Sequence, residues 1–311
     1  MKIRNILITG AAGFVGSHLA ERLLGEGYRV TGIDNLATGV QKQVPKSVRF
    51  FKRDIRDPSI VSLFGNIQAV FHLAAKNCIS DCQNDPVETT DINVRGTANV
   101  LEACRKANVS RVIVAESSAL YEGCTQYPTS EEEVCPQSFY AQSKLAAHAL
   151  ATAYQRYYRL PCTSLRYFNV YGPRQDYRRT IPPAMSAFII QLLKRQRPVI
   201  YGTGQKKRDF IYVDDINDFH LLCLKDRRSI GQTYNLGSGK KYSILQVYRM
   251  IDQMLQTGIK PIFKRDLPGE AQVTLADIGK ARKLGWKPKT TLEDGLQNSI
   301  EYIRRVVVSH Q

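Results

Sequence analysis

The stretch that decides the fold reads NILITGAAGFVGSHLAERLL, residues 5–24. Residues 3–9 are mostly apolar, which predicts a short buried strand. The amphipathic run after the glycines predicts a helix. Gly10 allows a tight turn, Gly13 lets the backbone approach a pyrophosphate, and Gly16 lets the helix pack closely on the strand. Together these features indicate a dinucleotide-binding unit, and the alternative is an ordinary turn in a ligand-free α/β protein.

The next predicted strand, residues 28–33, ends at Asp34. A carboxylate at this position of a dinucleotide-binding unit accepts both hydroxyls of the adenosine ribose. The same carboxylate would repel a 2′-phosphate, and no Arg follows Asp34 directly. The sequence therefore favours NAD over NADP. The alternative interpretation of Asp34 is a helix cap or a loop residue.

Strands and helices alternate through the first half of the chain. Further strands are predicted at 48–52, 69–73, 111–115 and 162–168, and long helices at about 86–107 and 138–158. This alternation predicts an α/β fold with a doubly wound parallel sheet. It stops after Pro173, where short strands, turns and helices are mixed. We expect this second part to cap the carboxyl ends of the strands, where ligands bind in such sheets.

The composition of the 311 residues is that of a globular protein. Hydrophobic residues make up 43%, enough for a sizeable core, and no apolar run approaches the length of a membrane span. The first residues lack the apolar region of a signal peptide, and the seven cysteines form no Cys-x-x-Cys pair. These features favour a cytoplasmic protein with reduced thiols. The net charge is +16, but the basic residues are spread along the chain, so nucleic acid is not expected as a partner.

The segment Tyr140-Ala-Gln-Ser-Lys144, near the start of the second long helix, carries the predicted chemistry. Its spacing puts Tyr140 and Lys144 on one helical face, one turn apart. An ammonium group beside a phenol stabilises the phenolate and lowers the tyrosine pKa from about 10 toward neutral pH. Tyr140 can then act as a general base toward an alcohol. Taken alone, the same pattern also fits a solvated surface helix.

Several segments together resemble the extended short-chain dehydrogenase/reductase family, in particular its nucleotide-sugar 4-epimerases. They are the glycine stretch 9–16, the Ser117-Ser118 pair with the Tyr-x-x-x-Lys segment, RYFNVYGP at 166–173, and RDFIYVDD at 208–215. The resemblance spans the whole chain. It implies a Rossmann domain over 1–171, to which parts of about 208–236 return, and a nucleotide-sugar-binding domain over 172–311.

The resemblance also implies roles for individual residues. Catalysis would use Ser117, Tyr140 and Lys144, with Ser118 as the rival of Ser117. The residues expected to bind NAD are Gly10, Gly13, Phe14, Val15, Gly16, Asp34, Asn35, Asp54, Ile55, Leu73, Ala74, Ala75, Asn93, Tyr140, Lys144 and Tyr167. The residues expected to bind a UDP-sugar are Ser117, Ser118, Asn169, Arg208, Glu270 and Thr274. No metal site is implied.

The type of reaction is inferred from acids that the chain lacks. The family's 4,6-dehydratases carry an Asp-Glu pair shortly after the catalytic hydroxyl, because elimination needs a separate acid and base. This chain has Ser118 and Ala119 there, which favours a 4-epimerase. Glu116 and Glu122 are unusual for the family and are candidates for displaced acids, so a dehydratase is one alternative. A non-catalytic NAD-binding scaffold is another, although such proteins typically lose the Tyr or the Lys.

The expected epimerisation does not consume NAD. Tyr140, aided by Ser117, takes the proton of the sugar 4-hydroxyl while hydride leaves C4. The 4-keto sugar rotates with its nucleotide anchored, and it is reduced again on the opposite face.

Leu267 occupies the position at which an Arg of the family usually contacts the phosphate, and Arg265 is a candidate substitute.

Two finer expectations concern the sugar and the assembly. The resemblance places Thr274 at the wall beside the C2 substituent of the sugar. Because Thr274 is small, we expect UDP-N-acetylhexosamines to be accepted, and plain UDP-hexoses as well. The alternative is that Thr274 only packs at the domain interface.

The helices expected at 86–107 and 138–158 match those that pair across the family's usual homodimer as a four-helix bundle.

Overall fold

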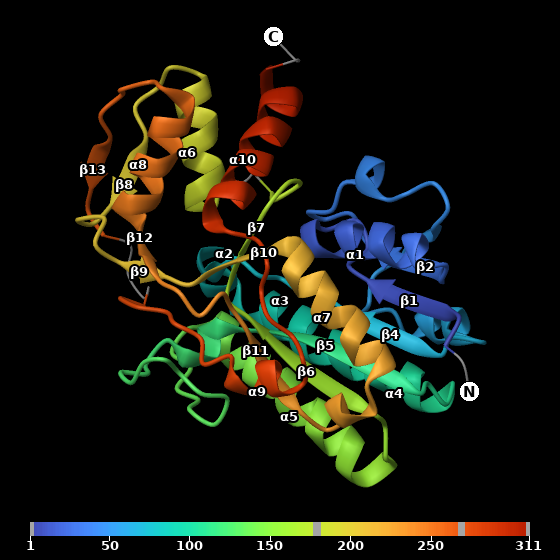
Figure 1. Ribbon diagram of the computed structural model, residues 1–311. Coiled ribbons are helices and arrows are strands. Elements are labelled where there is room, and N and C mark those ends of the chain that lie inside the picture. The colour runs from blue at the N-terminus through green and yellow to red at the C-terminus, as the bar shows by residue number, and fades with distance from the viewer. Residues whose placement is uncertain (1–2, 177–181, 267–270, 309–311) are drawn as a thin grey trace.

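A parallel sheet lies at the centre of the computed structural model, which describes residues 3–176, 182–266 and 271–308. Within these residues the sheet has seven strands in the order β11-β6-β5-β4-β1-β2-β3 (Figure 1). The strands are β1 (Asn5–Thr9), β2 (Arg29–Asp34), β3 (Arg49–Lys52), β4 (Ala69–His72), β5 (Arg111–Ser117), β6 (Cys162–Tyr167) and β11 (Thr233–Leu236). The order runs outward from β1 in both directions, so the predicted doubly wound Rossmann sheet is confirmed.

Helices cover both faces of this sheet (Figure 1). The helices are α1 (Phe14–Gly25) and α7 (Val213–Lys225) on one face, and α4 (Gly96–Lys106) and α5 (Phe139–Tyr158) on the other. Side chains alternate between the faces along each strand: Ile6 and Ile8 pack with the first pair of helices, whereas Leu7 packs with the second. Burial on both faces explains why the strands read as continuous apolar runs.

The long helix predicted over 86–107 consists of three consecutive pieces. They are α3 (Pro86–Thr90), a π-helical turn η3 (Asp91–Arg95) and α4. Asn93 lies in the π-turn, and it is buried. The second long helix, α5, begins at Phe139, where the Ser138 side chain accepts a hydrogen bond from the Ala141 N–H (3.1 Å). Such N-caps satisfy a helix-end donor and fix where the helix begins.

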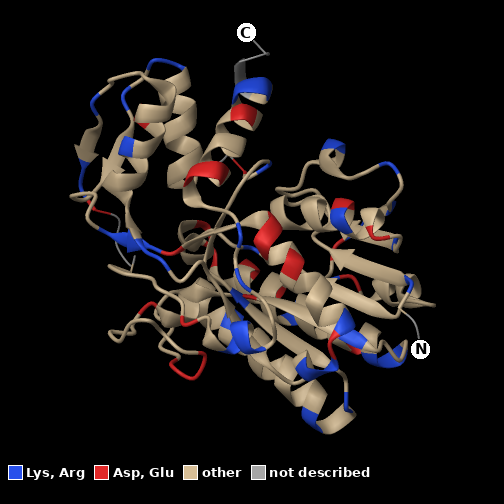
Figure 2. Cartoon of the chain, in the orientation of Figure 1, with Lys and Arg blue, Asp and Glu red and all other residues tan. Residues whose placement is uncertain are grey.

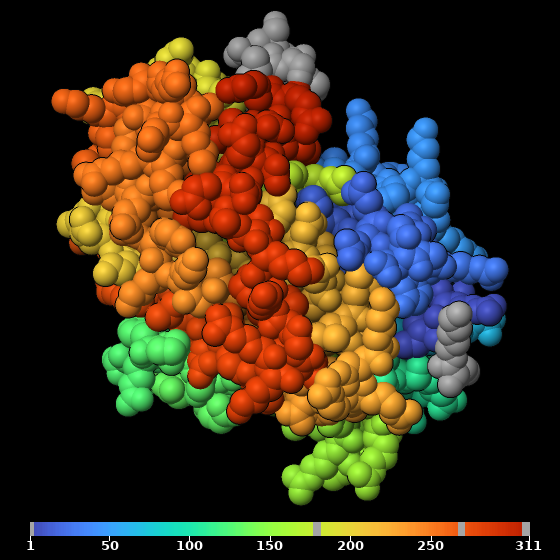
Figure 3. All heavy atoms as spheres, in the orientation of Figure 1, coloured from blue at the N-terminus to red at the C-terminus, as the bar shows by residue number. Residues whose placement is uncertain are grey.

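The C-terminal part has its own core. It lies between α6 (Ala184–Leu193), α8 (Ile244–Leu255) and α10 (Leu292–Ile303), with Phe188, Ile251 and Leu296 buried among them. Figure 3 shows the region of α8 and α10, orange and red, on one side of the visible face and the N-terminal residues, blue, on the other. β11 belongs to the central sheet, so the chain does return to it, while the domain boundary expected at residue 171 stays a prediction.

The remaining elements connect these layers. They are η1 (Gln41–Gln43), η2 (Pro58–Phe64), α2 (Ile79–Asn84), η4 (Ser118–Tyr121), β7 (Asn169–Tyr171), β8 (Val199–Tyr201), β9 (Lys207–Arg208), β10 (Phe210–Tyr212), η5 (Arg227–Ser229), β12 (Tyr242–Ser243), β13 (Ile262–Lys264), α9 (Gly279–Lys283) and η6 (Arg304–Val308). Lys and Arg residues occur on both parts of the molecule (Figure 2). Among the described helices, none has the length and apolar character needed to cross a membrane.

Candidate active site

A cavity of about 670 Å³ lies at the carboxyl ends of the strands, and β9 and residues 271 and 274 of the C-terminal part form its other wall. The structure brings most of the predicted site residues to this one cavity. Its lining includes Gly10, Gly13, Phe14, Val15, Gly16, Asp34, Asn35, Asp54, Ile55, Leu73, Ala74, Ala75, Ser117, Ser118, Tyr140, Tyr167, Asn169, Arg208 and Thr274. Asn93 and Lys144 are buried behind this surface. Glu270 and Leu267 lie outside the described residues.

The glycine turn forms the floor of the cavity beside α1. Gly10 has φ +76°, and a Cβ there would lie 2.8 Å from the Ala74 nitrogen. A Cβ at Gly16 would lie 2.0 Å from the Gly10 carbonyl oxygen, so only glycine allows the helix to approach the turn this closely. The N-cap of α1 is Gly13, and among the described residues no side chain caps this end. The first N–H groups of α1 therefore suit an anion such as a pyrophosphate.

Asp34 connects the glycine turn to the end of β2. Its carboxylate accepts hydrogen bonds from the Ala12 N–H (3.0 Å) and the Leu36 N–H (2.8 Å). Burial raises the pKa of Asp34, and the two backbone N–H groups act in the opposite direction. With one bond to each oxygen, the carboxylate keeps acceptor capacity for the hydroxyls of a ribose.

Asp54 is held differently from Asp34. Its carboxylate accepts from the backbone N, Nε and Nη2 of Arg56 and from Nδ2 of Asn35, at 2.7–3.0 Å. The Arg56 guanidinium holds the pKa of Asp54 well below its usual range. Four donors fill the acceptor sites of a carboxylate. The Asp54 side chain is therefore held in place as part of the cavity wall and has little capacity left to accept a hydrogen bond from a ligand.

The Ser117, Tyr140 and Lys144 side chains come from the end of β5 and the first turns of α5. Ser117 Oγ accepts a hydrogen bond from the Ala119 N–H (3.1 Å), and Tyr140 lines the cavity with 8% of its surface exposed. Lys144 Nζ donates to the Ala115 carbonyl oxygen (3.0 Å). Burial lowers the pKa of Lys144 to about 8, and the negative charge of Glu116 acts against this. The end of β5 and the first turns of α5 thus bring a phenol, a hydroxyl and a buried ammonium group to this part of the site.

The two unusual acids are both bound to protein groups. Glu122 accepts from the N–H groups of Gln137 (3.1 Å) and Ser138 (2.7 Å) and from Ser138 Oγ (2.9 Å), which fixes the loop before α5. The Glu116 side chain is fully buried and lies between His148 and Arg166. Both residues are part of the cavity lining, but the Glu116 side chain has no exposed surface and both Glu122 oxygens are bonded to the loop before α5.

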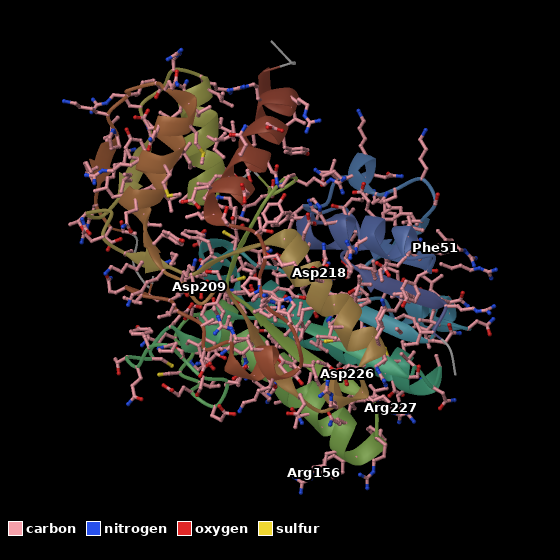
Figure 4. The ribbon with its side chains drawn as sticks, viewed as in Figure 1. Phe51, Arg156, Asp209, Asp218, Asp226 and Arg227 are labelled. Carbon is pink, nitrogen blue, oxygen red and sulfur yellow. The ribbon has the colours of Figure 1, made fainter. Side chains whose placement is uncertain are left out.

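Thr274 and Asn169 also line the cavity, and they are bonded to each other. Thr274 Oγ1 accepts from Asn169 Nδ2 and from the Asp209 N–H, both at 3.1 Å. Asp209, labelled in Figure 4, is buried at the junction of the two parts, where it accepts from Ser238, Gly239 and Ala276. The Thr274 hydroxyl thus orients Asn169. The sequence analysis considered only the small size of Thr274 and did not predict this hydrogen bond.

Some lining residues have no counterpart in the sequence prediction. Lys76 lines the cavity and forms an ion pair with Glu88 (Nζ–Oε2, 2.6 Å), while its backbone is held by the amide of Asn93 at 2.8 and 2.9 Å. Lys76 directly follows Ala75, just after the end of a predicted strand. Its place in the chain could therefore have identified it as a residue of the cavity lining. Further lining residues are Ile33, Ala37, Thr38, Arg53, Asn77, Ile79, Asp81, Ile92, Phe168, Val170, Gln175, Asp176, Pro183 and Ala271.

Comparison with known proteins gives consistent matches over the whole chain. Residues 6–237 match the model of the NAD dependent epimerase/dehydratase family. A protein of Methanocaldococcus jannaschii named putative UDP-glucose 4-epimerase is 34% identical, with 96% of this chain and 98% of the relative covered.

Two solved structures are similar in fold and in size. A UDP-N-acetylglucosamine 4-epimerase from Methanobrevibacter ruminantium, in complex with UDP-N-acetylmuramic acid, has a TM-score of 0.94 and 30% identity over 100% of both chains. A UDP-glucuronic acid 4-epimerase from Bacillus cereus, in complex with UDP-glucuronic acid and NAD, has a TM-score of 0.91 and 32% identity. That match covers 97% of this chain and 99% of the Bacillus chain.

Proposed function

The chain belongs to the NAD-dependent epimerase/dehydratase family, and on that premise we propose that it is an NAD-dependent UDP-sugar 4-epimerase. The observation that carries the proposal is a single cavity that contains both the glycine turn and the Ser117–Tyr140 corner. The glycine turn fits a dinucleotide, since its helix end has no side-chain cap within the described residues. The relatives are named as 4-epimerases of UDP-glucose, UDP-N-acetylglucosamine and UDP-glucuronic acid, which supports a UDP-sugar as the substrate.

The site residues would perform the acid–base part of the reaction. Bound NAD supplies a hydride acceptor and donor for C4 of the sugar. Tyr140 takes the proton of the 4-hydroxyl, Lys144 stabilises the phenolate by its charge, and Ser117 orients the hydroxyl. Asn169 and Arg208 would hold the diphosphate part, so that the 4-keto sugar turns before Tyr140 returns the proton.

The environment of the acids favours epimerisation over dehydration. Elimination of water needs a second acid or base at the sugar. Glu122 has both oxygens bonded to the loop before α5, and Glu116 is fully buried. The retention of both Tyr140 and Lys144 disfavours a non-catalytic scaffold.

Incubation of the purified protein with a panel of UDP-, GDP- and dTDP-sugars tests the proposal. The products are followed by mass spectrometry and NMR. An epimer has the mass of its substrate and a changed C4 configuration, whereas a dehydratase product is lighter by one water. NAD binding without turnover of any nucleotide sugar would contradict the proposal and support a scaffold.

We also propose a homodimer that forms through α3, η3, α4 and α5 as a four-helix bundle. Apolar side chains on these helices are exposed in the single chain, among them Val87 (79%), Tyr157 (72%) and Phe139 (47%). Covering them in a dimer would remove apolar surface from water. We further propose that the protein is located in the cytoplasm. All seven cysteines lie within the described residues and are free thiols, as is usual in a reducing compartment.

The small side chain of Thr274 supports acceptance of N-acetylated sugars. Thr274 lines the cavity, and a bulkier residue would reduce the space beside the sugar. We therefore propose that UDP-N-acetylhexosamines are substrates, along with UDP-glucose and UDP-galactose.

A further inference from the structure

Glu116 is a buried carboxylate that the proposed reaction does not use, although it directly precedes Ser117. Its side chain has no exposed surface. One oxygen accepts from His148 Nδ1 (2.7 Å) and the other from Arg166 Nε (3.0 Å). Despite the opposing effect of burial, these two partners lower the pKa of Glu116, so it is an anion at neutral pH. A carboxylate anion only accepts hydrogen bonds, so the proton lies on Nδ1 of His148.

The position of His148 links Glu116 to the Tyr140–Lys144 pair. Tyr140, Lys144 and His148 follow each other at intervals of four residues on α5, so they form a row along one face of the helix. Lys144 Nζ bonds to the carbonyl of Ala115, and His148 bonds to the side chain of the next residue, Glu116. Two neighbouring residues of β5 thereby hold two successive turns of α5.

Arg166 extends the same cluster to other strands. It lies on β6, its side chain is 3% exposed, and its Nη1 donates to the Tyr121 hydroxyl (2.8 Å) and to the Glu131 carbonyl oxygen (2.5 Å). The Tyr121 hydroxyl donates to Asn235 Oδ1 (2.6 Å) on β11. Because the cluster joins β5 to two further strands, β6 and β11, and to α5, the Glu116 carboxylate has a fixed place beneath the site.

We propose that Glu116 is a positioning residue for the proposed reaction: its bonds to His148 and Arg166 hold α5 in register with β5, and they fix a buried negative charge next to the Ala115 carbonyl that binds Lys144. The rate consequence rests on the proposed epimerase function, whereas the electrostatic consequence does not. The charged and titratable groups that interact with Glu116 or Lys144 are His72, Cys82, Tyr121, His148 and Arg166, and Glu131 faces Tyr121.

Loss of the Glu116 charge should change the pKa of Lys144 in a defined direction. Burial lowers the pKa of Lys144 and Glu116 raises it, so without Glu116 the ammonium loses its proton at lower pH. Because the phenolate of Tyr140 depends on the charge of Lys144, the titration of Tyr140 should change as well. The alkaline limb of the pH profile, which follows the loss of the Lys144 proton, should therefore move to lower pH. A residue that only supported packing would lower the height of the profile and leave its position unchanged.

The experiment uses the NAD-bound full-length protein and its Glu116→Gln variant, which removes the charge and keeps the size. The first readout is tyrosine ionisation by ultraviolet difference absorbance, corrected with Tyr140→Phe, and it needs no substrate. The second is kcat/KM against pH with the best UDP-sugar. We expect the alkaline kinetic limb to move to lower pH by about 0.5 or more, and the Tyr140 titration to differ from that of the wild type. If Glu116→Gln does not fold, Glu116→Ser takes its place in both measurements.

Two variants serve as matched controls. Glu116→Asp keeps the charge and should restore the position of the profile. Glu102→Gln removes a surface carboxylate that is likewise paired with an arginine, Arg105 (2.7 and 2.8 Å), and should move nothing. Coincident titrations of Tyr140 in the wild type and in Glu116→Gln would overturn the proposal. If the wild type turns over no nucleotide sugar, the proposed function fails, while the absorbance titration still decides about Glu116.

Discussion

At the scale of single residues, the Tyr140 hydroxyl is the group expected to exchange a proton with the sugar. Tyr140→Phe removes this hydroxyl and keeps the buried ring, so the fold should be unaffected. We expect kcat to fall at least about 100-fold, because general acid–base catalysis contributes that much or more. NAD should still bind, as measured by fluorescence titration. Near-normal turnover by this variant would remove Tyr140 from the mechanism.

The buried ammonium of Lys144 predicts an alkaline limit to activity. Burial lowers its pKa to about 8, so the positive form dominates below that pH and is lost above it. Because the phenolate of Tyr140 needs this charge, kcat should fall as the pH rises through about 8. His72 does not contribute to this limb, since burial lowers its pKa to about 3 and it is neutral throughout. A flat kcat from pH 7 to 10 would contradict the prediction.

Thr274 provides a test of sugar choice. Thr274→Tyr should abolish turnover of UDP-N-acetylhexosamines and spare that of UDP-hexoses, because the added ring fills the space beside C2. The substitution also removes the bond to Asn169, so a second variant is needed. Thr274→Val loses that bond without adding a ring, and it should affect both sugars equally. If Thr274→Tyr lowers both activities together, or if the wild type accepts no N-acetylated sugar, the wall assignment is wrong.

At the scale of elements, α1 contains two glycines in different environments. A Cβ at Gly16 would clash with the Gly10 carbonyl, whereas a Cβ at Gly25 would meet no atom within 4 Å. Gly16→Ala should therefore push α1 off the turn, weaken NAD binding at least tenfold and lower the melting temperature. Gly25→Ala should leave NAD binding unchanged and stabilise the protein by about 0.4–1 kcal/mol. Calorimetry and NAD titration of the two variants check this contrast, and equal NAD affinities would contradict it.

The elements of the fold differ in how well the sequence alone predicts them. The glycine turn and the buried strands are local patterns, so their positions were predicted to within one or two residues. The side-chain bonds of Asn93, to Lys76 and Ser143, and those of Glu116 have no local signal, because they join residues far apart in the chain. Arg166, for example, lies 50 residues from Glu116. Beyond Pro173 no periodic pattern continues, so Arg208 and Thr274 were assigned to the cavity wall from the family resemblance alone, while Gln175, Asp176, Pro183 and Ala271 were missed.

At the scale of the whole molecule, the proposed dimer determines what covers α3 and α5. An exposed valine on α3, Val87, would lie in the interface of a four-helix bundle. A charge placed there would have to be buried without a partner, at a cost of several kcal/mol. Val87→Arg should therefore convert the protein to a monomer at micromolar concentration in sedimentation velocity, while each chain keeps its fold by circular dichroism.

Phe263→Arg is the matched control for this substitution. Phe263 is also an exposed apolar residue (53%), but it lies on β13 in the C-terminal part, far from the helix pair (Figure 1). The control variant should sediment like the wild type. A wild type that is monomeric at micromolar concentration would rule out the four-helix interface. A dimer that survives Val87→Arg would place the interface elsewhere, because a stable one needs about 800 Å² per partner and does not tolerate an unpaired charge at its centre.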